Sequence, residues 1–151
     1  GGSGRIVRST DNGSAWDNVT SPTSNTLTDI VFGNSTFVAF GYSGTILTSS
    51  VGTTWDNRIS GTSYVLPGGT YGNSIFVTVG DIGTILTSSD AITWTSRTSG
   101  TSNKLRGITC GNSPFVAVGK SGTILTSSDS TTWTSRISGT SEHLRRVTYK
   151  E

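Results

Sequence analysis

The side chains best suited to chemistry in this chain are aspartates that recur in short Ser- and Thr-rich segments, at Asp11, Asp90 and Asp129. Aspartates bind metal ions or act as acids in many enzymes. They also accept hydrogen bonds from backbone amides that a chain reversal leaves unpaired. Each of the three stands shortly before a tryptophan in a turn-like segment, so we expect the structural role and no metal site.

Other catalytic groupings have little support in the sequence. His143 is the only histidine, and serines are so abundant that one near it is expected by chance. Their presence is therefore no evidence for a Ser-His-Asp triad. Cys110 aligns with Phe32, Tyr71 and Tyr149 of the other repeat copies, so we expect a buried thiol in the place of an aromatic ring. We therefore predict a noncatalytic protein that needs no cofactor.

The elements that must position these side chains are copies of one repeat. Four tryptophans stand 39 residues apart, at Trp16, Trp55, Trp94 and Trp133. This period divides the chain into units 3–42, 43–81, 82–120 and 121–151. Each unit offers four short strands, which in the third copy are expected at 105–110, 115–119, 122–126 and 133–137. Gly-Asn pairs between the first two strands of a unit predict hairpin turns.

Four short antiparallel strands per unit of about 40 residues are typical of a β-propeller blade. A β-trefoil uses similar units but needs three of them. We therefore predict an all-β propeller, with residues 1–151 forming a single domain or a fragment of about four blade equivalents, one of them incomplete. Residues 144–149 would supply the inner strand of the incomplete blade and residues 5–19 its outer two. This predicts either a closed four-bladed ring or an open fragment that pairs its edges with another chain.

The tryptophan rings are expected to fill the spaces between neighbouring blades. A buried ring of this size removes about 150 to 250 Å² from water. At about 25 cal/mol per Å², each ring would contribute at most roughly 4 to 6 kcal/mol. We therefore predict that the four rings form much of the core.

Composition excludes several functional classes. The net charge is +2 and no polybasic run occurs, which argues against a nucleic-acid partner. A single cysteine excludes an internal disulfide, and no apolar stretch approaches the length of a membrane span. Methionine is absent, so we expect an N-terminus that was processed, excised or engineered. An extracellular, periplasmic or virion-surface location is favoured.

The segment Ser9 to Trp16 resembles the Asp-box, or BNR repeat, with the pattern Ser-x-Asp-x-Gly-x-x-Trp. The three later copies are one residue shorter, and the second has Val51 in place of the aspartate. The segments Gly-Ile-Thr-Cys-Gly-Asn-Ser-Pro-Phe-Val-Ala-Val-Gly and Ser-Gly-Thr-Ile-Leu-Thr-Ser-Ser-Asp resemble repeats of bacterial and phage surface proteins and of photosystem II assembly-factor propellers. The resemblance implies a propeller in which the box is the turn between the third and fourth strands.

Asp-box repeats also occur in sialidases, which hold the substrate carboxylate with arginines on the propeller axis. The arginines that repeat every 39 residues here are Arg58, Arg97 and Arg136. Each follows its tryptophan by three residues on the expected outer strand, far from the axis and on the opposite face from the ring. A degenerate glycosidase is therefore the third choice among functions.

The repeat copies differ most at two turns on one face and at the start of the inner strand. The latter positions carry the pairs Thr28-Asp29, Pro67-Gly68, Arg106-Gly107 and Arg145-Arg146. We predict a ligand-binding face that includes Tyr42, Tyr64, Asp81, Lys104, Arg106, Lys120, His143 and Arg145. The first hypothesis is a protein-interaction or surface-structural scaffold, with self-assembly through the incomplete blade. The alternative is a carbohydrate-binding propeller, supported by Tyr42 and Tyr64.

Overall fold

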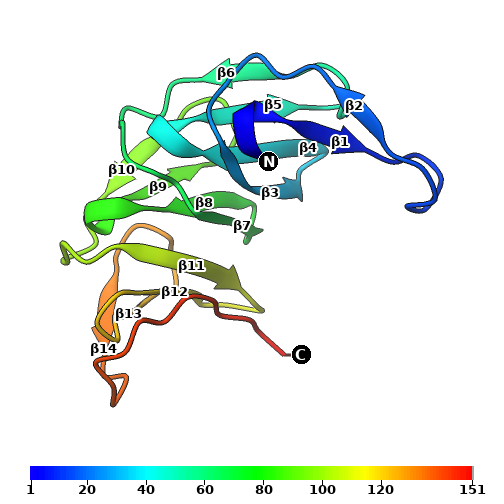
Figure 1. Cartoon of the computed structure of the whole chain (residues 1–151). Helices are drawn as coiled ribbons and strands as arrows, with labels where there is room; N and C mark the ends of the chain where they lie inside the picture. The colour runs from blue at the N-terminus through cyan, green and yellow to red at the C-terminus, as the bar shows by residue number, and fades with distance from the viewer. Residues whose placement is uncertain (151) are drawn as a thin grey trace.

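A computed structural model describes residues 1–150 of the chain as an all-β array of sheets (Figure 1). An N-terminal hairpin pairs β1 with β2, and three four-stranded antiparallel sheets follow it. The strands are β1 (Ile6–Arg8), β2 (Asp17–Val19), β3 (Leu27–Gly33), β4 (Thr36–Gly41), β5 (Ile46–Ser49), β6 (Asp56–Arg58), β7 (Gly68–Gly72), β8 (Ile75–Val79), β9 (Ile85–Ser88), β10 (Thr95–Arg97), β11 (Leu105–Cys110), β12 (Phe115–Gly119), β13 (Ile124–Ser127) and β14 (Thr134–Arg136). Short 3-10 turns occupy η1 (Gly2–Gly4), η2 (Tyr42–Gly44) and η3 (Asp81–Gly83).

The three complete sheets are blades of a propeller, each with its strands in chain order. Blade 1 consists of β3–β6, blade 2 of β7–β10 and blade 3 of β11–β14. The inner strands β3, β7 and β11 lie side by side, and the outermost strands β6, β10 and β14 follow the outside of the arc (Figure 1). The predicted all-β propeller with one incomplete blade is therefore confirmed.

The strand predictions for blade 3 hold for β11 and β12 at both ends, while β13 and β14 start later than expected. The first two hairpin turns shift by one residue from the predicted Gly-Asn pairs, whereas Gly111 and Asn112 lie between β11 and β12 as predicted. Asn34 and Ser35 have φ angles of 45° and 56°, whereas Gly33 is the last residue of β3. Gly33 is needed for another reason, since a Cβ there would overlap the ring of Tyr71 on the next blade.

The expected closing blade does not form among the described residues. The N-terminal hairpin is a separate two-stranded sheet, and no strand lies within residues 144–149. This C-terminal segment still follows the course of an inner strand beside blade 3, because the Leu144 amide donates to the Gly119 carbonyl oxygen at 2.9 Å. The N-terminal hairpin and the C-terminal segment lie at opposite ends of the arc, so the chain has the open arrangement rather than the closed ring (Figure 1).

The hydrophobic core consists of three clusters, one at each contact between successive sheets. The cluster between blades 1 and 2 joins Val38, Phe40 and Ile46 of blade 1 to Phe76 and Leu86 of blade 2. Equivalent clusters join the hairpin to blade 1 and blade 2 to blade 3. Apolar side chains of each blade are thus removed from water by the neighbouring blade, which stabilises the array.

The prediction that all four tryptophan rings lie between blades is wrong for Trp16, which is 61% exposed. The other rings pack toward the preceding sheet: Trp55 is 8% exposed, and Trp94 meets Phe40 of blade 1 edge-on with ring centroids 5.7 Å apart. Trp133 packs against the cluster between blades 2 and 3. Trp16 belongs to the first sheet of the array, so no preceding sheet covers its ring.

The expected burial of Cys110 and its aligned aromatics is also wrong. Cys110 is only partly buried, and Phe32 is 58% exposed. These side chains lie near the hairpin end of the inner strand and pack over a glycine of the preceding blade, as Tyr71 does over Gly33. Phe32 has no complete preceding blade beneath it, so its ring meets water.

Candidate functional site

The recurring aspartates sit in turns between the third and fourth strands of the sheets and bond the backbone of those turns. Oδ1 of Asp90 accepts hydrogen bonds from the amides of Ile92 and Thr93, both at 2.8 Å. Oδ1 of Asp129 accepts from the amides of Thr131 and Thr132 at 2.8 and 2.7 Å. These backbone donors stabilise the ionised carboxylates, so the pKa of Asp90 falls to about 2 and the pKa of Asp129 is also lowered.

The second copy of the turn works without an aspartate. The amides of Val51 and Gly52 donate to the hydroxyl of Ser49 at 3.3 and 2.7 Å. These are the amides of the residues equivalent to Asp90 and Ala91, so Ser49 bonds a different pair of amides from the Asp90 carboxylate. The aspartates thus hold the later part of the turn, a structural role that accounts for their hydrogen bonds. Residues 1–150 contain no group of three or more His, Cys, Asp or Glu side chains that could hold a metal ion.

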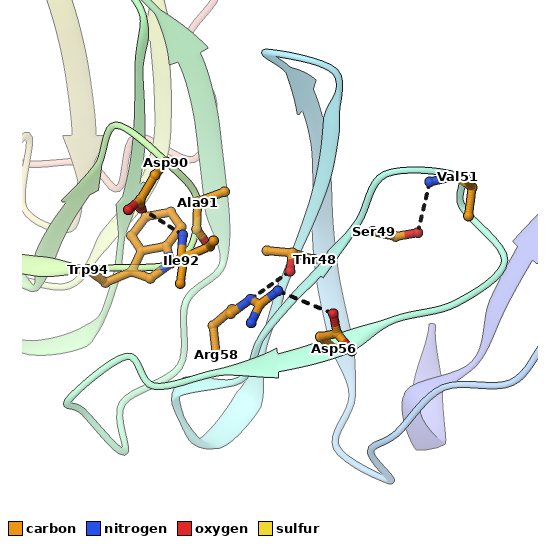
Figure 2. Close-up of polar contacts among 9 residues, drawn as sticks. All are labelled: Thr48, Ser49, Val51, Asp56, Arg58, Asp90, Ala91, Ile92 and Trp94. Carbon is orange, nitrogen blue, oxygen red and sulfur yellow. Dashed lines mark hydrogen bonds and ion pairs between the residues drawn. The ribbon is translucent and has the colours of Figure 1, made fainter.

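The repeated arginines lie on the outer strands, away from the inner edge. Nε of Arg58 donates to the hydroxyl of Thr48 at 2.8 Å, and its Nη2 lies 3.2 Å from the Asp56 carboxylate (Figure 2). The arginine faces the Asp90 turn of the next blade, and Arg58 and Asp90 line one cavity. An arginine set converging on the propeller axis is therefore not formed by these residues.

A groove of about 500 Å³ runs along the inner edge of the array. It passes over the starts of β3, β7 and β11 and reaches the C-terminal segment. Four of the eight predicted ligand-face residues line it. These are Tyr42, Lys104, Arg106 and Arg145. Its volume is in the range of ligand pockets, about 300 to 1,000 Å³.

Irregularities at the start of the inner strands place side chains in this groove. The pairing of β3 with β4 shifts register between Leu27 and Asp29, and the pairing of β11 with β12 shifts between Leu105 and Gly107. Thr28 and Arg106 are thus the extra residues of two β-bulges, and a bulge re-aims a side chain. Pro67 stands at the equivalent place before β7, where a missing amide donor is tolerated.

The groove is strongly cationic toward its C-terminal end. Its basic lining residues are Lys104, Arg106, Arg145 and Arg146, and its one acidic lining residue is Asp29. Oδ2 of Asp29 is held by the Gly69 amide at 2.9 Å. Nε of Arg106 is buried and has no hydrogen-bond partner among the described residues. Arginine side chains among other cations of a groove are suited to binding an anionic ligand group.

The other predicted ligand-face residues lie outside the groove lining. Asp81 forms an ion pair with Lys104, with Oδ1 and Nζ 2.6 Å apart. Nδ1 of His143 accepts from the Ser121 amide at 3.1 Å, Tyr64 is 45% exposed, and Lys120 is partly buried. Asp29 and Arg146 line the groove and were selected from the sequence only as variable positions. The bulge beside Asp29 follows from strand register, which the sequence pattern does not show.

Comparison with known proteins supports the fold. No protein-family model and no curated protein matches the sequence. The structure titled YCF48 from Cyanidioschyzon merolae is 21% identical with a TM-score of 0.69, over 81% of this chain and 40% of that one. The structure of YCF48 bound to D1 peptide is 19% identical with a TM-score of 0.63, over 89% of this chain and 47% of that one. The chain thus spans less than half of either structure, and the similarity establishes a propeller-like fold.

Proposed function

We propose that this chain is a noncatalytic β-propeller scaffold that binds a segment of another protein in its inner groove. The observation that carries the proposal is the cluster of four basic side chains around the groove, with the Arg106 Nε left unpaired. The fold similarity adds support, because YCF48 has been solved with a bound D1 peptide. We also propose self-assembly through the incomplete end of the array, as a separate part of the function on which groove binding does not depend.

The lining of the groove favours an extended acidic peptide as the ligand. The bulge position changes along the array from Thr28 beside Asp29, through Pro67, to Arg106 and Arg145. An acidic peptide would place its carboxylates at the C-terminal end of the groove, where bidentate arginine contacts can form. Asp29 would repel carboxylates at the other end, which gives the bound peptide a direction.

Fluorescence polarisation tests this proposal with three labelled ten-residue probes, rich in glutamate, rich in lysine and uncharged. We expect the acidic probe to bind most tightly and to weaken as salt rises, since salt screens charges. The variant Arg106→Gln should weaken it by about tenfold or more, the loss expected for a central interface arginine. Arg97→Gln on outer strand β10 removes the same charge outside the groove and serves as the matched control.

Equal binding of the acidic and basic probes would overturn the groove proposal, as would equal losses in the two arginine variants. A glycan array tests the alternative function, carbohydrate binding. That alternative is supported by the exposure of two tyrosines, Tyr42 (49%) and Tyr64 (45%). Glycan binding that survives Arg106→Gln but not Tyr42→Ala would favour the carbohydrate-binding function over the peptide-binding one.

A further inference from the structure

The two ends of the array expose opposite halves of one interface. Inside the chain, a leucine on the third strand faces the preceding sheet, and Leu47, Leu86 and Leu125 are at most 2% exposed. The equivalent residue of the N-terminal hairpin is Val7, which is 49% exposed, beside Trp16 at 61%. This face of the hairpin therefore carries the same kinds of residue as the faces that pack against a preceding blade inside the array.

The opposite end presents the complementary half. Val38 and Ile46 of blade 1 are covered by blade 2 and are at most 1% exposed, and blade 2 repeats this at Val77 and Ile85. Their equivalents in blade 3, Val116 and Ile124, are only partly buried, and the described residues form no complete blade beyond blade 3. The outer face of blade 3 therefore lacks the partner that blades 1 and 2 have.

The charges at the two ends also match. Between blades 1 and 2, Arg58 of the outer strand and Asp90 of the next turn line one cavity (Figure 2). Their equivalents at the ends are Arg136, exposed on β14, and Asp11, exposed in the hairpin turn. The arginine thus lies at one end of the array and the aspartate at the other. A head-to-tail contact between two copies would bring the two side chains together.

We propose that a second copy of this chain covers these faces, with the Val7 and Trp16 face of one copy packing on the Val116 and Ile124 face of the next. The chain already forms this contact between its own sheets, so the interface continues an established one. It is heterologous, and repetition of it closes into a ring or extends into a filament. The hairpin lacks inner strands of its own, so less area is buried than between complete blades and association is expected to be reversible.

Sedimentation velocity over a wide concentration range tests the proposal on the full chain. The wild type should show mass that rises with concentration, and Trp16→Ser should weaken association by about 30-fold, the effect of an interface hot spot. Ile59→Ser is the matched control. Ile59 is 87% exposed on an internal blade and lies outside the repeated interface, so its loss should leave association unchanged.

Mixing experiments distinguish head-to-tail contact from a symmetric one. Trp16→Ser weakens one face and Val116→Lys the other, so each variant alone should be mostly monomeric at a concentration where the wild type associates. Their mixture should form a one-to-one dimer through the remaining pair of intact faces. Arg136→Glu, at an exposed position, replaces Val116→Lys if circular dichroism shows that the latter is unfolded.

Three results would overturn the inference: a wild-type chain that stays monomeric at every concentration, an assembly insensitive to Trp16→Ser, or a mixture that remains monomeric. Binding of the acidic probe reports separately on the groove. Trp16 lies outside the groove lining, so Trp16→Ser should keep wild-type affinity for that probe. Failure of one proposal therefore leaves the other testable in the same proteins.

Discussion

The same substitution at equivalent positions of the repeat should have very different costs. Trp55→Ala removes a ring that is 8% exposed and packs against Ile6 of the hairpin and Leu27 and Ala39 of its own blade. Burial of about 150 to 250 Å² at about 25 cal/mol per Å² sets an upper limit of roughly 4 to 6 kcal/mol. Truncation of a buried tryptophan typically costs about 3 to 5 kcal/mol, which we expect here.

Trp16→Ala changes the same residue type at the first position of the repeat, where the ring is 61% exposed. Its indole Nε1 donates to the Gly13 carbonyl oxygen at 3.1 Å, as Trp55 does to Gly52 at 3.3 Å. The hydrogen bond is therefore common to both sites, and the two rings differ in whether a preceding sheet covers them. An exposed substitution of this kind should cost no more than about 0.5 kcal/mol.

Urea denaturation of both variants, followed by circular dichroism at a concentration where the chain is monomeric, measures the difference. The m-values should match that of the wild type, since a change in m would mean that the denatured state or the cooperativity had changed. Equal losses of unfolding free energy in Trp16→Ala and Trp55→Ala would refute the argument, because the preceding sheet would then contribute nothing to the packing of the ring.

Two further predictions concern the turns and the blade contacts. Because the folded-state pKa of Asp90 is lowered from 3.8 to about 2, its carboxylate stabilises the fold above pH 3.8, and that contribution is lost as pH falls toward 2. The difference in urea midpoint between wild type and Asp90→Ala should therefore shrink over this interval, and a difference equal at pH 2 and pH 5 would contradict it. Gly69→Ala should cost about 1 to 3 kcal/mol, because its Cβ would overlap the fully buried ring of Phe40. Gly2→Ala meets no atom within 4 Å and is the control, so equal thermal shifts in the two variants would refute this close approach.

The blades could be predicted from the sequence because the residues of each strand indicate where it begins and ends. Alternation of apolar residues and the glycines at their ends are sufficient to place β11 and β12 at both termini. Exposure cannot be predicted in the same way, since it depends on which sheet lies beside a residue. Trp16 and Trp55 occupy the same place in the repeat, yet only Trp55 has a preceding sheet to cover it.

The groove was partly predictable for a similar reason. Variation among the copies identified Arg106 and Arg145 as positions that the scaffold leaves free, and both line the groove. The pattern did not distinguish them from Lys120 and His143, which vary equally but lie at neighbouring turns. Tyr42 and Lys104 occupy the same turn positions as Lys120 and His143 in their own repeats, yet they line the groove. What separates the two groups is therefore the place of each repeat in the array, which the sequence of one repeat does not contain.

A single repeat unit thus provides two kinds of surface by two different means. Positions that face the next blade must stay apolar in every copy, because the neighbouring sheet buries them. These positions are exposed only at the two ends of the array, where a neighbouring sheet is missing. The bulges of blades 1 and 3 carry Thr28 and Arg106, and both residues line the groove, so this position accommodates different side chains. Substitution of Arg106 should therefore alter ligand affinity with little change in stability, whereas substitution of Thr28 also removes its hydroxyl hydrogen bonds to the Phe40 and Leu66 carbonyl oxygens. Substitutions at Val116 or Trp16 should alter association. These two responses are separable because no residue belongs to both surfaces.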